Sequence, residues 1–174
     1  ALAGTLRRGE EEAPRPLLRL ALAAGAAVVL VAAASLALPW LATKEVQQAA
    51  HEWKRDPASA FARLDRARRL NPLSEDADLH AGAIASRLGE HGRMAASFRR
   101  AVARDDASWY AWLELAMAES LQGRRDAALA ALARAHALDP GEDTIRQVAA
   151  TVRAGRRVDP AAIDRTMLGR IPVR

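Results

Sequence analysis

The chain contains no cysteine, and aromatic residues make up only 4% of its 174 residues. The absence of cysteine excludes disulfide bonds, thiolate catalysis and zinc sites built on thiolates. The sequence also lacks a phosphate-binding loop, a dinucleotide-binding glycine motif, a nucleophile elbow and a paired-histidine zinc motif. We therefore expect no enzymatic activity in this segment, no cofactor and no metal.

Apolar residues make up 51% of the chain, and much of that share is alanine and leucine, which favour helix. No segment alternates Val, Ile or Thr with polar residues, so we expect no sheet. The fold class predicted is all-α. The net charge of +5 comes mostly from arginine. The arginines either lie on solvated helix faces or give the chain affinity for an anionic surface. The basic tail at 156–174 has no aromatic residues between its arginines, so we expect no nucleic-acid binding.

A period of 34 residues runs through the middle of the chain. Large apolar residues and alanines recur together at this spacing: Leu64, Phe98, Leu132, and Ala67, Ala101, Ala135. The period is typical of stacked helix–turn–helix units, each of which buries its apolar face only against its neighbours. Such arrays usually bind other proteins.

Counted from Leu41, Glu75 and Trp109, the eighth position of each unit should be small so that the paired helices approach closely. The residues at this position are Gln48, Gly82 and Ala116. At the fifteenth position, Gly89 and Gly123 are expected to end the first helix with positive φ. Near the end of the unit, Pro72 and Pro140 stop the second helix.

The helices predicted from these signals cover residues 43–55, 57–70, 75–88, 91–104, 108–122, 125–138, 142–154 and 160–168. Ser74, Ser108 and Asp159 are the expected N-caps. The helix at 142–154 carries one apolar stripe (Ile145, Val148, Ala149, Val152) and should cap the last unit. The predicted organisation is a flexible segment at 1–16, a transmembrane helix at 17–42, a repeat array at 43–140, a capping helix at 141–155 and a basic tail at 156–174.

These features resemble the tetratricopeptide repeat family over about residues 43–140. The third unit matches best, with Trp112, Leu115 and Pro140 at family positions. In the first unit Lys44, Gln47 and His51 replace the expected large apolar residues. The resemblance implies a short solenoid of about three helix pairs plus a capping helix.

The resemblance also implies a groove lined by the first helix of each unit, which binds a protein or peptide. Carried onto this sequence, the lining residues are Trp53, Asp76, Leu79, Ala83, Arg87, Tyr110, Leu113, Met117 and Leu121. The Lys and Asn clamp by which some members hold a peptide carboxylate is absent. A partner helix or an extended peptide fits better, although repeats that only pack and space are an alternative.

Residues 20–42 contain no charged side chain, and 23 residues in a helix are long enough to cross a bilayer. Arg15 and Arg19 flank one end, and Trp40 and Lys44 flank the other. A transmembrane helix over 17–42 is the main interpretation. A cleaved signal peptide and a buried alanine-rich helix are the alternatives. The balance of basic residues slightly favours repeats outside a bacterial cell membrane.

Two functions fit these patterns. The first is a non-catalytic, membrane-anchored module for protein–protein interaction or complex assembly. The second follows from a resemblance of the segment order, Leu38-Pro39-Trp40-Leu41 and then Trp109-Tyr110-Ala111-Trp112, to the C-terminal part of actinobacterial O-antigen ligase/polymerase-type membrane proteins, which assemble cell-surface polysaccharide. The chain begins at Ala1 rather than at methionine, so we expect it to be a fragment of a longer protein. No catalytic residue can be assigned in it.

Overall fold

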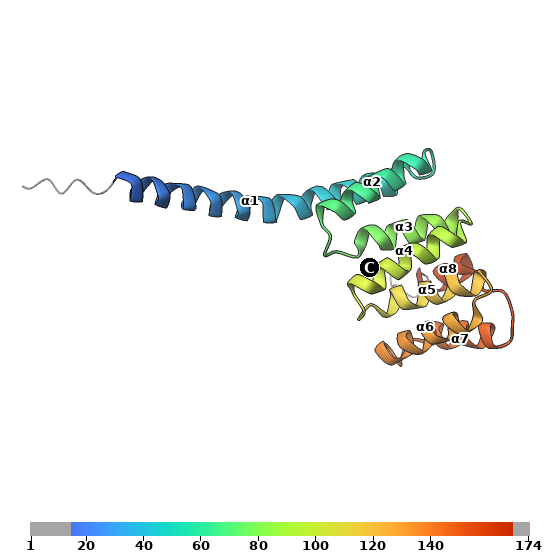
Figure 1. The fold of residues 1–174 in the computed structure, drawn as a ribbon. Helices are drawn as coiled ribbons and strands as arrows, with labels where there is room; N and C mark the ends of the chain where they lie inside the picture. The colour runs from blue at the N-terminus through green and yellow to red at the C-terminus, as the bar shows by residue number, and fades with distance from the viewer. Residues whose placement is uncertain (1–14, 169–174) are drawn as a thin grey trace, which may run out of the picture. The chain divides into compact units, whose positions relative to one another are not determined.

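The computed structural model describes residues 15–168, which are helical with short connections and contain no strand (Figure 1). The helices within this range are α1 (Arg15–Glu52), α2 (Pro57–Leu70), α3 (Asp76–Arg87), α4 (His91–Arg104), α5 (Trp109–Leu121), α6 (Arg125–Leu138), α7 (Asp143–Arg153) and α8 (Pro160–Leu168). The predicted all-α class is confirmed for these residues. The flexible segment expected at 1–16 and the end of the basic tail fall largely outside them.

The chain divides between Pro39 and Trp40 into two compact units. In the first unit the structure describes residues 15–39 of α1. Of the side chains described there, Leu20, Leu22, Val28, Val29 and Val31 are 66–68% exposed. Among the described residues, a search for a helix long and apolar enough to cross a membrane finds none. The span expected at 17–42 is therefore unconfirmed.

The second unit holds the end of α1 and all the later helices. From α2 to α7, each helix packs against the next one along the chain, which is the packing of a helical repeat (Figure 1). The predicted bounds of α2, α4, α6 and α8 coincide with the observed ones, and those of α3, α5 and α7 differ by one residue at each end. Gly89 and Gly123 have φ of 72° and 74°, as predicted, because each reverses the chain between paired helices.

Helices α3 and α4 approach each other closely at Gly82 of α3 and Phe98 of α4. A Cβ placed on Gly82 would lie 2.5 Å from Cε2 of Phe98, which is far inside van der Waals contact. The Phe98 ring is completely buried and has no room to retreat. Glycine at this position therefore allows the pair to pack around a large aromatic side chain.

In the first helix pair the predicted register is wrong by one residue. Gln48 was expected at the small position, but it is exposed, and Ala49 is the residue with 0% exposure. Eight residues separate Ala49 from Pro57, whereas nine separate Gly82 from His91 at the equivalent place in the second pair. The spacing from the small residue of the first helix to the start of the second is thus one residue shorter in the first pair, and its connection at 53–56 has no glycine. Every inner-face position of α1 therefore moves by one.

With this register corrected, an ion pair at the same repeat position joins the two helices within each of the first two pairs. Glu45 of α1 lies 3.2 Å from Arg66 of α2, and Asp78 of α3 lies 2.8 Å from Arg100 of α4. The arginines are 34 residues apart. Asp78 is fully buried and also pairs with Arg104. This carboxylate holds α3 and α4 together, and the sequence analysis did not identify it.

The helix ends follow the expected chemistry with one exception. The Ser108 hydroxyl accepts a hydrogen bond from the Ala111 amide at 3.4 Å, and the Asp159 carboxylate accepts one from the Ala162 amide at 3.2 Å. The N-cap position of α3 is Glu75, one residue after the predicted Ser74, and its side chain makes no cap hydrogen bond. The Ser74 hydroxyl still accepts a hydrogen bond from the Asp76 amide, the first of the helix, at 3.1 Å. The apolar stripe of α7 is buried as predicted.

Replacing Gly82 by alanine should lower the free energy of unfolding, because the added methyl overpacks the Phe98 ring at a cost of about 1–3 kcal/mol. The gain in helix propensity, about 1 kcal/mol, offsets part of this cost and leaves a net loss of up to about 2 kcal/mol. The matched control is Gly92→Ala in α4, where a Cβ meets nothing within 4 Å. That variant should be neutral or slightly more stable in urea denaturation. Equal effects of the two substitutions would contradict the close-approach argument.

Candidate partner-binding groove

The predicted groove residues differ in how accessible they are. On α3, Asp76 and Arg87 are exposed, and Leu79 and Ala83 are half-buried. Three others are also half-buried: Trp53, Tyr110 and Leu121. The structure brings Trp53 and Arg87 together, with the Arg87 guanidinium 6.0 Å from the centre of the indole ring. The inner face is therefore accessible along α3.

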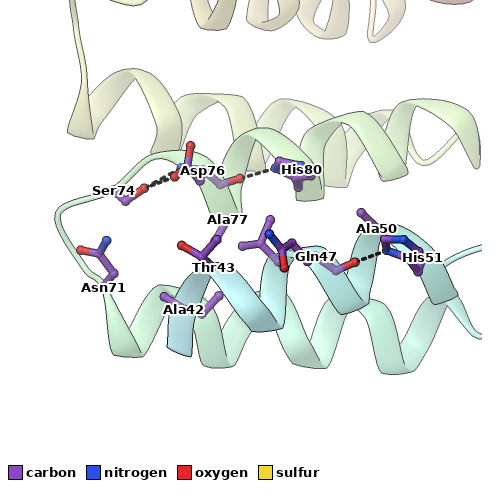
Figure 2. A pocket seen from close by; sticks show the side chains of 12 residues that line it. Ala42, Thr43, Gln47, Ala50, His51, Asn71, Ser74, Asp76, Ala77 and His80 are labelled. Atoms are coloured by element: carbon purple, nitrogen blue, oxygen red, sulfur yellow. Dashed lines mark hydrogen bonds between the residues drawn. The ribbon is translucent and has the colours of Figure 1, made fainter. Parts of the chain in front are cut away.

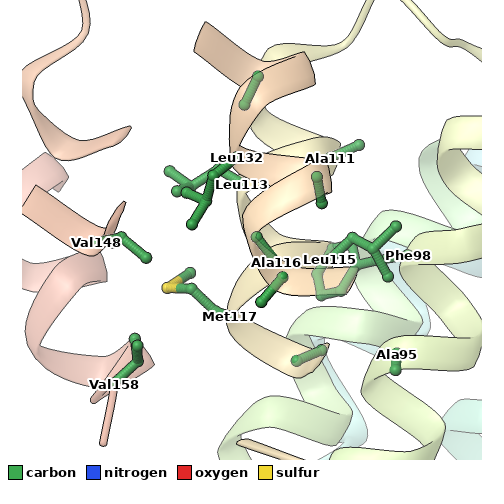
Figure 3. Packing of buried hydrophobic residues seen from close by; sticks show 14 of the residues in the cluster. Ala95, Phe98, Ala111, Leu113, Leu115, Ala116, Met117, Leu132, Val148 and Val158 are labelled. Atoms are coloured by element: carbon green, nitrogen blue, oxygen red, sulfur yellow. The ribbon is translucent and has the colours of Figure 1, made fainter. Parts of the chain in front are cut away.

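On α5 the prediction needs correction. Leu113 and Met117 are both 0% exposed, so neither contacts a partner in this conformation. They belong to the main hydrophobic cluster, together with Val158 and Ile163 from the C-terminal part of the chain. Figure 3 shows Val148 of α7 and Val158 lying on the side of α5 toward which Met117 points. The chain itself covers the α5 end of the predicted groove.

An open pocket of about 270 Å³ lies between α1, the end of α2 and the start of α3 (Figure 2). Its apolar lining includes the buried residues Ala42, Val46, Ala67 and Ala77. Its more exposed lining is mostly polar: Thr43, Gln47, His51, Asn71, Ser74, Asp76 and His80. An apolar floor with a few polar groups at the rim is the usual composition of a binding pocket.

This pocket belongs to the predicted inner face once the register of α1 is corrected. The shift by one residue makes Thr43, Val46 and Ala50 equivalent to Asp76, Leu79 and Ala83 of α3. All three of those α1 residues line the pocket. Sequence reasoning missed them because the shorter spacing between Ala49 and Pro57 is not visible from the 34-residue period alone.

Two histidines on facing helices, His51 and His80, lie at the rim of the pocket, and their hydrogen bonds show which ring nitrogen carries the hydrogen. Nδ1 of His51 donates to the Gln47 carbonyl at 2.6 Å, and Nδ1 of His80 donates to the Asp76 carbonyl at 2.9 Å (Figure 2). A carbonyl only accepts, so Nδ1 carries the hydrogen in both rings and Nε2 of the neutral ring is an acceptor. Among the described residues, no group of three or more His, Asp or Glu could hold a metal ion.

A buried acid marks the place where α8 meets the rest of the unit. Glu114 of α5 is 3% exposed, and burial together with the nearby charge of Asp164 on α8 raises its pKa to about 8. A hydrogen bond with the Tyr110 hydroxyl and the charge of Arg87 partly oppose this rise in pKa. Burial also raises the pKa of Asp164, against the effect of Arg87. Glu114 therefore holds its proton at neutral pH.

The opposite case occurs at the far end of α5. Burial alone would raise the pKa of Glu119, but hydrogen bonds from Arg124 and Arg99 lower it below its usual value. Arg99 lies 2.5 Å from this carboxylate and Arg124 also pairs with it. Two buried glutamates on one helix thus differ in charge because only one of them has cationic partners in direct contact.

No protein-family model matches the chain, and a comparison with curated proteins finds no significant match. The geometry of the inner face is therefore the basis for proposing a function.

Substituting Glu114 by glutamine should stabilise the protein more at pH 9 than at pH 5. In the folded state this carboxyl keeps its proton up to about pH 8, whereas a carboxyl with the usual pKa of 4.5 has released it. The free energy of unfolding therefore falls as the pH rises from about 4.5 to about 8. Each pKa unit corresponds to about 1.4 kcal/mol, so the advantage of the variant at pH 9 should reach a few kcal/mol in urea denaturation.

Glu119→Gln is the control of opposite sign. Because ion pairs lower the pKa of Glu119, this substitution should destabilise the protein at neutral and alkaline pH. Parallel pH profiles for the two variants would contradict the assignment of charges.

Proposed function

We propose that this chain is a non-catalytic interaction module of the tetratricopeptide repeat type, which binds a segment of another protein across the inner face of α1 and α3. The observation that carries the proposal is the open pocket between these helices, with its apolar floor and polar rim. The pocket lies on the face where the repeat pattern predicted partner contacts.

The size of the pocket favours a side chain of a larger partner. Its volume of about 270 Å³ is below the ~300–1,000 Å³ typical of pockets for drug-sized ligands. Ala42, Val46, Ala67 and Ala77 would receive an aliphatic side chain. Gln47 and Asn71 at the rim offer amide donors and acceptors for the polar backbone on either side of it.

The charge of the inner face favours an internal segment over a free C-terminus. Capture of a terminal carboxylate needs cationic or amide donors at the centre of the groove. The central positions of α1 and α3 hold Val46, Ala50, Leu79 and Ala83, none of which can donate from its side chain. Arg87 lies at the end of α3 and stacks on Trp53.

The proposal also places the module beside a membrane, through residues 17–42. The support is the absence of charge over residues 20–42 and the exposure of the described Leu and Val side chains there. Several exposed large apolar side chains on one helix are stabilised by a partner that removes them from water. Trp40 and Lys44, whose ammonium lies 5.6 Å from the indole centre, suit the headgroup region.

Flotation with phospholipid vesicles tests the membrane part. The chain should rise with the vesicles in a density gradient, and the double variant Val28→Arg/Val29→Arg should stay in the dense fraction because two charges oppose insertion. A control with Arg at two exposed positions of α6, Ala130 and Ala137, should float like the unmodified chain. Flotation that is independent of the substitutions at 28 and 29 would contradict the anchor.

Site-specific photo-crosslinking in the host cell tests the groove. A photoreactive residue at Ala50, which is exposed and lines the pocket, should give an adduct of discrete mass. The same residue at Ala103, exposed on α4 and away from the pocket, should give none. Adding Gln47→Trp, an exposed position at the rim, should abolish the adduct by filling the pocket. Equal crosslinking at both positions, or an adduct insensitive to Gln47→Trp, would refute the proposal.

A further inference from the structure

The C-terminal helix α8 occupies part of the face that the repeat pattern assigns to partners. Val158 and Ile163 are 3% and 7% exposed, and both belong to the cluster that contains Leu113 and Met117 of α5. Met167 is half-buried against the same cluster. Ile163 and Met167 are four residues apart and therefore lie on one side of α8. This segment contacts α5 as an amphipathic partner helix would.

The polar side of this contact reaches α3. Ser86, Arg87 and His91 line a cavity of about 250 Å³ together with residues of the α8 segment, among them Asp159, Ala161 and Asp164. Arg87 and Asp164 line this cavity together, and the charge of Arg87 lowers the pKa of both Asp164 and Glu114 against the effect of burial. The α8 segment thus combines an apolar side with a carboxylate that lies near a cation.

The attachment of α8 is light compared with that of α7. Five residues of α7 are buried (Thr144, Ile145, Val148, Ala149 and Val152), and this helix packs along α6. From the whole described segment after Gly155, only Val158 and Ile163 are buried. Asp164 lies near the buried Glu114, and its charge raises the pKa of that carboxyl. A short helix held by so few side chains can leave the rest of the unit folded.

We propose that α8 is an internal ligand that occupies in cis the binding site for an amphipathic helix of another protein, which binds α5 after displacing α8. The chemistry of α8 defines that partner. It is a helix with large aliphatic side chains four residues apart and a carboxylate placed to meet Arg87, as Ile163, Met167 and Asp164 are. The inference rests on the proposed function, since it assumes that the inner face binds protein, but it concerns α5 and not the pocket at α1.

The test uses the full chain and a fluorescein-labelled peptide with the sequence of residues 156–168. Ile163→Asp in the full chain should release α8, and the labelled peptide should then bind at least ten times more tightly than it binds the unmodified chain, by fluorescence anisotropy. Thr166→Asp, which adds the same charge at an exposed position of α8, should leave binding at the level of the unmodified chain. A peptide carrying the Ile163→Asp change should not bind.

Each other outcome contradicts the proposal. If Ile163→Asp leaves the circular dichroism spectrum intact but does not improve peptide binding, the α5 face does not recognise this helix. If it unfolds the unit, α8 is an integral part of the core. A concentration-dependent dimer of the unmodified chain in sedimentation would assign the site to α8 of a second copy.

Hydrogen exchange on the unmodified chain tests, without any variant, whether α8 detaches from the rest of the unit. Amides of α8 should exchange at least ten times faster than those of α5 and α7, and equal protection would overturn the proposal. If no crosslink forms at Ala50 but the peptide binds as expected, only the proposed pocket between α1 and α3 is refuted. If the crosslink forms but the peptide does not bind, only the proposed internal ligand is refuted.

Discussion

The architecture of the second unit depends on how closely the two helices of each pair approach. The contact between Gly82 and the buried Phe98 ring shows how little space is available, and Ala49 and Ala116 are the equivalent small residues in the other pairs. Because a small residue stands at this position in each pair, the two helices can lie at a similar distance in every pair along the chain. Close pairing also sets the first helices of successive pairs on one face, which makes an inner surface possible.

Buried carboxylates reinforce this arrangement in a chain with an excess of arginine. Asp78 has no solvent contact and pairs with Arg100 and Arg104, while Glu119 pairs with Arg99 and Arg124. A buried charge is tolerated only when such partners surround it. Glu114 lacks a cation in direct contact and takes the other solution, which is to remain protonated. It lies where α8, the most lightly held helix, meets α5.

Most helix ends could be predicted from the sequence, because glycine, proline and serine act on the backbone next to them. The register of α1 could not, because its turn has no glycine and Arg55 stands where the repeat frame placed one. The position of α8 is a different case. Val158, Ile163 and Met167 carry no repeat signal, and the hydrophobic cluster that includes Leu113 and Met117 brings together segments about 45 residues apart. The burial of Leu113 and Met117 was therefore not foreseen from the sequence.

The central claim is that α8 covers the inner face at α5 and at the end of α3, while the face at α1 and the start of α3 stays open. Because the chain has no cysteine, Ala161→Cys gives a unique site for a nitroxide label on α8. Paramagnetic broadening in an NMR spectrum should then be strong for the amides of Ser86, Arg87 and His91, which line the same cavity as Ala161, and should persist when labelled chains are diluted with unlabelled ones. Unchanged intensities at these three amides would show that α8 does not lie on this face.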